Sequence, residues 1–413
     1  MTSFELRPVG GDSQQAGFTQ LIWGLATSVT ANVDAWLSSL GPVSPAAVDL
    51  VRMAAAAYMA DRQTRRPVGY TRSIQLHVQV TDVDRSGAVV GQVVNLLQWL
   101  TADLWEMSLG ADGLDRPEAS LAPGEQPESV ALLSGGLDSM AAAVAGADGS
   151  RRAFVAHWDN PTVKASQDRV WNWLRDVPGV NADYRQVRIA EAASKQESST
   201  RSRSLLFFAL AVALASSSRC DTVEVPENGF TSLNMSLGNN RGGVLSTRST
   251  HPWTIRQVQG IVDALGLGIR VHNPYERLTK GELVALAGVN PEFPQGVPLT
   301  LSCGKMDGRW YHAGNPNYNC GLCVACLTRR GSLLSAGLQD ETPYLMNTID
   351  EESKPYLLER RSGDVLAVRA AVSEDIDEFA LLAQGPYPDD FDLTAAVGLC
   401  RRGLAELKRA LPQ

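Results

Sequence analysis

The chain has 413 residues, of which 44% are hydrophobic and 20% are charged, and its formal net charge is −8. This composition is typical of a globular protein with two or three domains, and the acidic balance disfavours a protein that wraps nucleic acid. The N-terminus lacks the pattern of a secretory signal, and the strongest apolar run, residues 205–215, is shorter than the roughly 20 residues of a membrane span. We therefore expect a cytoplasmic protein that does not contact a membrane.

Residues 1–110 are expected to form an accessory α+β domain. Apolar and polar residues alternate over residues 74–80, which predicts a half-buried strand. Apolar residues from Val93 to Leu104 then recur at helical spacing, which predicts an amphipathic helix. Residues 111–128 are rich in proline, glycine and acidic residues, so they are expected to be a linker.

Short apolar strands alternate with helices from residue 129 onward. Strands are expected at 129–133, 153–156, 222–225 and 269–271. Helices are expected at 140–145, where Gly146 ends the helix, from Val170, and at 205–216. This alternation predicts a parallel sheet covered on both faces, with ligands bound beyond the carboxyl ends of its strands.

Two later segments have a different character. Residues 227–252 are polar and rich in glycine, as in loops that are functional or disordered. Residues 345–413 are expected to form a helical C-terminal extension with a break at Gly385-Pro386.

A candidate phosphate loop joins the first of these strands to an alanine-rich helix: Ser134, Gly135, Gly136, Leu137, Asp138 and Ser139. The glycines let the backbone bend tightly toward an anion, and the helix N-terminus and the serine hydroxyls supply donors. Asp138 is expected to act through Mg²⁺ or by fixing the loop. The GK[ST] ending of a Walker A loop is absent. An ordinary glycine-rich turn is the alternative, but the full string in this context favours nucleotide binding.

Four of the six cysteines share one short stretch with the spacing C-x16-C-x2-C-x2-C: Cys303, Cys320, Cys323 and Cys326. Clustered cysteines in a reducing compartment are more often metal ligands than disulfides. Four sulfur ligands describe a closed, structural zinc site. An iron–sulfur cluster or a redox-active CxxC pair are the alternatives. Cys220 and Cys400 are expected to be core residues.

The string Ser134–Ser139 resembles the signature of the PP-loop superfamily, whose members split ATP into AMP and pyrophosphate. Together with the cysteine cluster it resembles the 7-cyano-7-deazaguanine synthase family. Further similar segments are Cys320–Cys326 followed by Arg329, Ala336-Gly337, Asp340 and Thr342–Tyr344; Leu278–Glu282; and Thr200–Arg203. The resemblance covers roughly residues 129–344 and implies a parallel-sheet core of the adenine-nucleotide alpha-hydrolase type that binds ATP, with the four-cysteine zinc site in the same domain.

Members of that family adenylate the carboxylate of 7-carboxy-7-deazaguanine, and ammonia and further ATP then yield the nitrile. The resemblance implies that ATP, Mg²⁺ and structural Zn²⁺ are used and that the six loop residues hold pyrophosphate. Lys280 and Arg203 would neutralise charge on the phosphates, and residues 154–160, including His157, would line the adenine and ribose site. A solvated Lys280, a surface Arg203 and a core Trp158 are the alternatives.

The chain departs from the family beside this nucleotide region. His157-Trp158-Asp159-Asn160 stands where the family has Tyr-Gly-Gln, and the N-terminal domain and C-terminal extension are additions. The family's substrate segment is replaced by residues 227–252. The substrate-binding candidates in the replacement are Asn228, Arg241, Thr247, Arg248 and His251, with Ser246 beside them.

This pattern resembles a divergent branch of the family found in bacterial anti-phage defence (CBASS-type) systems. In that branch the deazaguanine can be joined to the amino terminus of a partner protein. The expected activity is therefore transfer of a 7-deazaguanine, used as its carboxylate or its nitrile, to an amine of a partner protein, by a monomer or a homodimer. The rivals are a free-standing nitrile synthase that uses ammonia, a tRNA-modifying PP-loop enzyme, and a non-catalytic nucleotide-binding scaffold.

Overall fold

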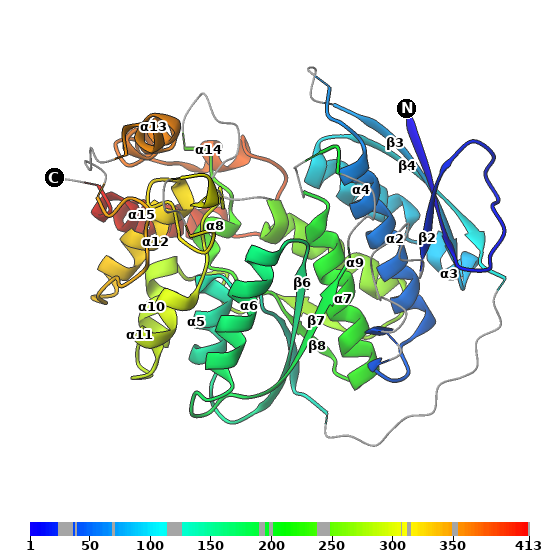
Figure 1. Ribbon diagram of the computed structural model, residues 1–413, viewed down its shortest axis with the longest axis horizontal. Helices are drawn as coiled ribbons and strands as arrows, with labels where there is room; N and C mark the ends of the chain where they lie inside the picture. Colours follow the sequence, from blue (N-terminus) through cyan, green and yellow to red (C-terminus); the bar gives the residue numbers. More distant parts are fainter. Residues whose placement is uncertain are drawn as a thin grey trace.

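The computed structural model describes most of the chain: residues 1–23, 36–37, 39–67, 71–113, 126–189, 195–197, 201–237, 248–306, 308–311, 315–348 and 354–411. Figure 1 shows an N-terminal sheet at one end of the molecule, a second sheet in the middle and helices of the C-terminal region at the other end. Both sheets are entirely parallel, which confirms the predicted α/β class for the chain but not the α+β arrangement expected for residues 1–110.

The N-terminal unit is a four-stranded sheet in the order β2-β1-β3-β4. The strands are β1 (Thr2–Pro8), β2 (Thr19–Trp23), β3 (Ser73–Val80) and β4 (Leu104–Ala111), and the helices are α2 (Pro45–Gln63), α3 (Val83–Gly87) and α4 (Val90–Thr101). The predicted amphipathic helix is α4, but it ends at Thr101, and Leu104, which was counted in its apolar pattern, is an exposed residue of β4. The strand predicted at residues 74–80 is confirmed as β3, but it is not half-buried, because the polar residues His77 and Gln79 are only 3% and 1% exposed. Their polar atoms bond to Ser108 and to Glu5 instead of to solvent.

The central sheet has five parallel strands in the order β7-β6-β5-β8-β9. Their bounds are β5 (Ser129–Leu132), β6 (Arg151–Trp158), β7 (Asn181–Arg188), β8 (Thr222–Glu224) and β9 (Arg270–His272). Four of these strands lie where the sequence predicts them. The fifth, β7, was not predicted. It is an edge strand in which Ala182, Tyr184 and Gln186 face inward only in part, so its sequence carries little apolar signal.

Helices cover both faces of the central sheet: α5 (Leu137–Ala145), α6 (Pro161–Leu174), α7 (Arg203–Ser218), α9 (Pro252–Ala264) and α10 (Lys280–Ala287). Phe154 packs with α5, α6 and α10, whereas its neighbour Val155 packs with α7 and α9. The predicted end of α5 at Gly146 and the predicted α7 are confirmed. The helix predicted from Val170 begins earlier, because Asn160 accepts a hydrogen bond from the Val163 amide and Pro161 occupies the first turn.

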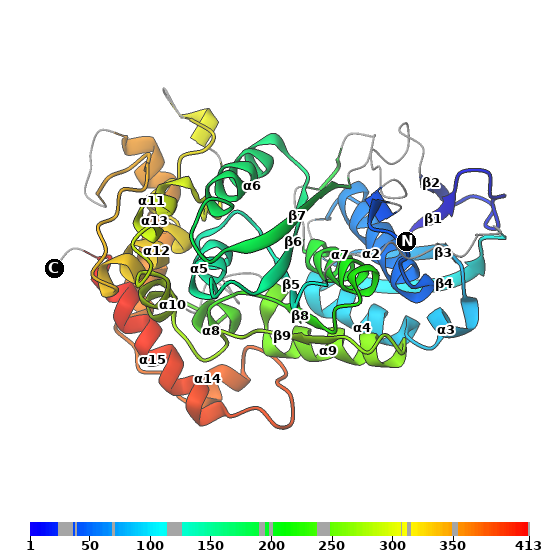
Figure 2. The same cartoon turned by 90° about the horizontal axis from the view of Figure 1, so that it is seen from below.

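The N-terminal unit and the central sheet share one continuous apolar cluster. The alanine-rich helix α2 lies along α7 (Figure 2), and both contribute to a cluster that also contains the inner residues of β1 and β3. An ion pair between Arg62 and Asp159, 2.9 Å long, joins α2 to the end of β6. The N-terminal unit therefore covers the α7 face of the central sheet. Residues 114–125, most of the predicted linker, lie outside the described residues.

The C-terminal region is helical, as predicted. The predicted extension contains α13 (Pro355–Ala371), α14 (Glu378–Leu382) and α15 (Leu393–Arg409), which pack with the preceding helix α12 (Val324–Ser335). The predicted break at Gly385-Pro386 falls between α14 and α15. These helices share an apolar cluster with the four clustered cysteines and with the short helix α8 (Gly229–Ser232). Shorter turns complete the path: α11 (Phe293–Gly296) and 3-10 turns at Arg248–Thr250, Val297–Leu299 and Gly308–Trp310.

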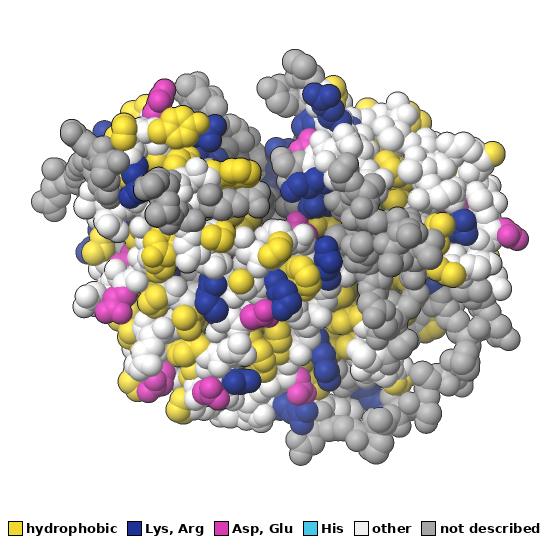
Figure 3. All heavy atoms as spheres, in the orientation of Figure 1, with side chains coloured by type: hydrophobic (Ala, Val, Ile, Leu, Met, Phe, Trp, Pro, Cys, Tyr) yellow, Lys and Arg dark blue, Asp and Glu magenta, His cyan; other side chains and the backbone are white. Residues whose placement is uncertain are grey.

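The structure also bears on two expectations from the sequence: the absence of a membrane span and the acidic charge of the chain. Among the described residues, no helix has both the length and the apolar character that crossing a bilayer requires. On the face drawn in Figure 3, Lys and Arg side chains gather along a band in the middle of the molecule. Positive charge is therefore concentrated locally although the whole chain is acidic.

Candidate functional site

A cavity of about 480 Å³ lies at the carboxyl ends of β5 and β8, where parallel sheets bind their ligands. One wall is the loop at residues 134–138 with Lys280 at the start of α10. The facing wall is formed by residues 301–305 and the first turns of α12, and Asp364 of α13 also contributes. The cavity thus joins the candidate phosphate loop to the cysteine cluster and to the C-terminal extension.

The bend of the phosphate loop requires glycine at position 135. Gly135 has a φ of +82°, and a Cβ atom there would lie 3.0 Å from the backbone nitrogen of Gln167. Its carbonyl oxygen accepts hydrogen bonds from Ser166 Oγ (2.8 Å) and from the Leu301 amide (3.0 Å). The loop is therefore held from α6 on one side and from the cysteine-bearing segment on the other.

The loop presents hydrogen-bond donors toward the cavity. The amide of Gly136 donates to Ser134 Oγ (3.2 Å), and the amide of Leu137 donates to Ser302 Oγ (3.2 Å). Ser139 Oγ accepts from the Ser134 amide (3.2 Å) and shares a hydrogen bond with Ser134 Oγ (3.1 Å). Because these amides open helix α5, the arrangement is suited to an anion, whose oxygens can replace the hydroxyl acceptors.

A buried ion pair links the loop to α10. Lys280 Nζ contacts Asp138 Oδ2, and Asn228 Nδ2 donates to Asp138 Oδ1 at 3.2 Å. Burial by itself would raise the pKa of Asp138, but the charge of Lys280 and the hydrogen bonds to the carboxylate outweigh it and lower that pKa. The side chain of Lys280 is 7% exposed, so the alternative of a solvated lysine is wrong.

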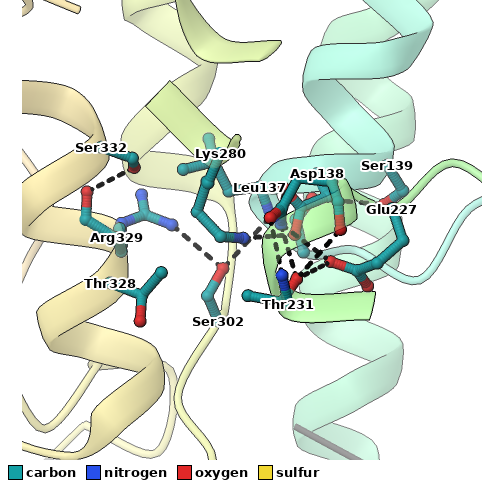
Figure 4. A network of polar contacts seen from close by, with 12 residues as sticks. Leu137, Asp138, Ser139, Glu227, Thr231, Lys280, Ser302, Thr328, Arg329 and Ser332 are labelled. Atoms are coloured by element: carbon teal, nitrogen blue, oxygen red, sulfur yellow. Dashed lines mark hydrogen bonds and ion pairs between the residues drawn. The ribbon is translucent and has the colours of Figure 1, made fainter. Parts of the chain in front are cut away.

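Glu227 completes this cluster and was missed as a site residue in the sequence analysis. Its Oε1 accepts hydrogen bonds from Thr231 Oγ1 (2.8 Å) and Asn228 Nδ2 (3.2 Å), as Figure 4 shows in part. Burial, followed by the adjacent charge of Asp138 and a hydrogen bond to it, raises the pKa of Glu227 well above its usual value. Protonation of Glu227 is therefore favoured over that of an exposed glutamate, whereas the neighbouring Asp138 is held toward its ionised form. Its position directly after β8, at the carboxyl edge of the sheet, was the available signal.

A buried arginine supports the loop from the opposite wall. Arg329 of α12 is fully buried and donates to Thr300 Oγ1 (2.6 Å), Thr342 Oγ1 (2.9 Å) and Ser302 Oγ (3.3 Å). Ser302 Oγ in turn accepts a hydrogen bond from the Leu137 amide. The guanidinium of Arg329 therefore supports the loop through this shared hydroxyl (Figure 4). In the sequence, Arg329 stands out only as part of the resemblance to the synthase family.

His157 and Arg203 lie outside the residues that line this cavity. Arg203 Nη2 donates to the His157 carbonyl (2.7 Å) and its Nε donates to His157 Nδ1 (3.2 Å), while His157 Nε2 bonds to Ile189. Burial and then the charge of Arg203 lower the pKa of His157 to about 3, so its ring is neutral. The His157 side chain is fully buried, which does not agree with its predicted place in the lining of a nucleotide site. Trp158, the alternative core residue, is only partly buried and lies 4.9 Å from the Arg188 guanidinium.

The predicted substrate residues separate into three groups. Asn228 supports the cavity through its bonds to Asp138 and Glu227. Arg248 and His251 do not face the cavity, because both pack on Trp99 of α4, at 4.0 Å and 5.3 Å from its ring centre. They therefore join α9 to the N-terminal unit, and their predicted role is not supported by their position. Arg241, Thr247 and the neighbouring Ser246 lie outside the described residues.

The four clustered cysteines form a compact group of buried thiols. Their Sγ atoms all lie within 4.8 Å of one another, and the Cys303–Cys323 and Cys320–Cys326 separations are 4.0 Å and 3.8 Å. Four thiolates bound to one tetrahedral zinc ion would lie about 3.8 Å apart, given Zn–S bonds of about 2.3 Å. The group could therefore hold a metal ion. Cys220 and Cys400 are buried core residues, as predicted.

Known proteins match the chain over about a fifth of its length. No family model matches it. The 7-cyano-7-deazaguanine synthase of Xanthomonas campestris pv. campestris (strain B100) is 36% identical over 83 residues, which are 20% of this chain and 33% of that protein. The chain is similar in part to these synthases. The protein of the same name from Syntrophobacter fumaroxidans is 36% identical over 77 residues, or 19% of this chain and 29% of that protein. The chain thus spans about a third of the length of the curated relatives it matches.

Proposed function

We propose that the protein adenylates the carboxylate of a 7-deazaguanine with ATP and transfers the activated group to a nitrogen nucleophile. The observation that carries this proposal is the cavity in which the donor-lined loop, the buried Lys280–Asp138 pair and the cysteine cluster meet. The partial similarity to 7-cyano-7-deazaguanine synthases supports the choice of substrate.

The cavity supplies what adenylation requires. A carboxylate oxygen attacks the α-phosphorus of ATP and pyrophosphate leaves. A neutral amine then attacks the acyl carbon, loses a proton, and AMP leaves with the carboxylate oxygen. The loop amides and Lys280 offset the charge that develops on the leaving pyrophosphate. Asp138 would hold Mg²⁺, which supplies further positive charge at the phosphates.

The four cysteines would hold Zn²⁺ in a structural role. A closed set of four sulfur ligands leaves no open position for catalysis. Two of them, Cys303 and Cys323, line the cavity, so the ion would fix the wall that faces the phosphate loop. Reduced thiols at such a site agree with a cytoplasmic location.

The acceptor in this proposal is the terminal amine of a partner protein in anti-phage defence. Ammonia and an α-amine attack an acyl adenylate in the same way, so a protein acceptor requires altered access and no new chemistry. Two features of the chain support such access. The family's substrate segment is replaced by residues 227–252, and the C-terminal extension contributes Asp364 to the cavity.

Intact-mass measurement tests this transfer. The full chain is incubated with ATP, Mg²⁺, 7-carboxy-7-deazaguanine and the proteins encoded beside its gene. We expect a deazaguanine adduct on one partner protein, which disappears when that protein's terminal amine is blocked. Free nitrile formed with ammonia, without any adduct, would instead identify a free-standing synthase. Failure to release pyrophosphate with any deazaguanine would favour a nucleotide-binding scaffold.

Gly135→Ala is expected to lower ATP-dependent pyrophosphate release about tenfold or more, because the added Cβ displaces the loop from its donors. Gly149→Ala is the matched control, since Gly149 also has a positive φ (+89°) but meets no atom within 4 Å. Both variants should lose stability from the strained backbone, and Gly135→Ala should lose more because of its close contact with Gln167. At a temperature where both variants are folded, only Gly135→Ala should lose activity. Equal activities in the two variants would contradict the role assigned to the loop.

A further inference from the structure

The first turn of α10, which carries Lys280, is stabilised by a capping box. Thr279 Oγ1 accepts a hydrogen bond from the Glu282 amide (3.1 Å), and Glu282 Oε2 accepts one from the Thr279 amide (2.8 Å). This local motif is sufficient to start a helix. It does not by itself fix where that helix lies relative to the phosphate loop.

A second set of contacts to the same turn comes from α15, at the far end of the chain. Glu406 accepts a hydrogen bond from Thr279 Oγ1 with one carboxylate oxygen and from the Gly281 amide (2.9 Å) with the other. Glu406 is 8% exposed, and its carboxylate lies at the N-terminus of α10, where the helix dipole favours a negative charge. Thr279 and Gly281, the two residues that Glu406 binds, are the sequence neighbours of Lys280.

Arg402, one turn before Glu406 in α15, holds the same segment from the surface. Its Nε donates to Glu282 Oε1 (2.7 Å), and its Nη2 donates to the Arg277 carbonyl (3.0 Å). Arg402 and Glu406, which lie four residues apart on one face of α15, therefore bind the N-terminus of α10 from both sides.

Two glycines allow this close approach. A Cβ at Gly281 would lie 2.5 Å from Glu406 Oε1, and a Cβ at Gly331 of α12 would lie 2.3 Å from the Glu406 carbonyl oxygen. Helix α15 therefore has little room to shift relative to α10 or α12. A displacement of Glu406 would pass directly to the backbone that carries Lys280.

We propose that Glu406 is a positioning residue for Lys280. It holds the start of α10 at the distance and direction from which the lysine side chain reaches Asp138 and the phosphate loop. This inference rests on the proposed function, in which Lys280 contacts the phosphates of ATP. It makes the C-terminal extension, which lies outside the resemblance to the synthase family, part of the nucleotide site.

Binding and kinetics of full-length variants test the proposal. Glu406→Ala removes both acceptors. Glu406→Gln keeps one acceptor for the Gly281 amide and can donate to Thr279 Oγ1, so it is the conservative variant. Arg401→Gln is the control, because Arg401 lies on the same helix but pairs with Asp375 (3.0 Å) on the surface. Equilibrium binding of ATP with Mg²⁺ is measured by calorimetry, KM and kcat by pyrophosphate release, and stability by thermal melting.

We expect Glu406→Ala to weaken ATP binding on the order of tenfold at a temperature where the variant is fully folded. Glu406→Gln should restore most of the affinity, and Arg401→Gln should match the wild type. If Glu406→Ala does not fold, Arg402→Gln is compared with Arg401→Gln, and only the former should weaken binding. Wild-type affinity in folded Glu406→Ala, or in Arg402→Gln where the alanine variant does not fold, would overturn the positioning role. A wild-type protein that binds no ATP would overturn the proposed function itself.

Discussion

Lys280→Ala is expected to reduce kcat/KM for ATP-dependent pyrophosphate release by about 10²–10³-fold, the usual effect of removing one preorganised charge-stabilising group. The lysine is buried, ion-paired to Asp138 and directed into the cavity beside the loop amides. In the proposed reaction it is the side-chain cation best placed to offset charge on pyrophosphate. Water is a poor substitute for this positive charge, because the Lys280–Asp138 pair is largely buried.

The same substitution should also destabilise the fold, which must be separated from the effect on chemistry. Removing Lys280 leaves Asp138 buried beside Glu227 without a counter-charge, and breaking a buried ion pair in this way costs about 3–5 kcal/mol. The double variant Asp138→Asn/Lys280→Met removes both charges and should regain stability without regaining activity. Lys164→Ala, which breaks a half-exposed pair with Asp168, should alter neither property. Near-wild-type turnover in Lys280→Ala would contradict the assigned role.

Cys323→Ser is expected to abolish stoichiometric zinc binding and to lower the free energy of unfolding by several kcal/mol, since the binding energy of a structural ion is part of the folding energy. Cys323 also precedes the first turn of α12 and lines the cavity, so nucleotide binding should weaken as well. Elemental analysis of the purified protein and thermal melting with and without a chelator provide the measurements.

Cys400→Ser is the matched control for the metal site. Cys400 is fully buried in the same apolar cluster but lies outside the group of four thiols. The Cys400→Ser variant should keep its zinc. Its free energy of unfolding should fall by only about 1–3 kcal/mol, the cost of burying a hydroxyl in an apolar cluster. Iron and visible absorption in the purified protein would support the iron–sulfur alternative, and a protein without metal whose melting is unaffected by a chelator would contradict a structural ion.

Local sequence signals predicted the elements that carry the phosphate loop. An apolar strand, two glycines and an alanine-rich helix define β5, the loop and α5 without reference to the rest of the chain. Edge strand β7 carries no such signal, because its side chains alternate between solvent and partial burial. The start of α6 at Asn160-Pro161 is a capping signal that periodicity alone overlooks.

The site was predicted where its residues are local and missed where they depend on tertiary packing. Asp138 and the cysteines stand in short motifs. Glu227 lies beside Asp138 only because β8 pairs with β5, and Glu406 reaches α10 across a separation of 127 residues from Thr279. Arg248 was predicted to bind substrate because its loop stands where the resembling family has its substrate segment, but the packing of α9 on α4 places it on Trp99.

The central claim, that a carboxylate is adenylated in this cavity, is tested most directly by oxygen transfer. The full chain is given ATP, Mg²⁺ and 7-carboxy-7-deazaguanine labelled with ¹⁸O in its carboxylate, together with an amine acceptor, and the nucleotide products are analysed by mass spectrometry. We expect AMP that carries one heavy oxygen, formed together with pyrophosphate and absent with Lys280→Ala. Label recovered in inorganic phosphate together with ADP, or unlabelled AMP, would contradict this claim.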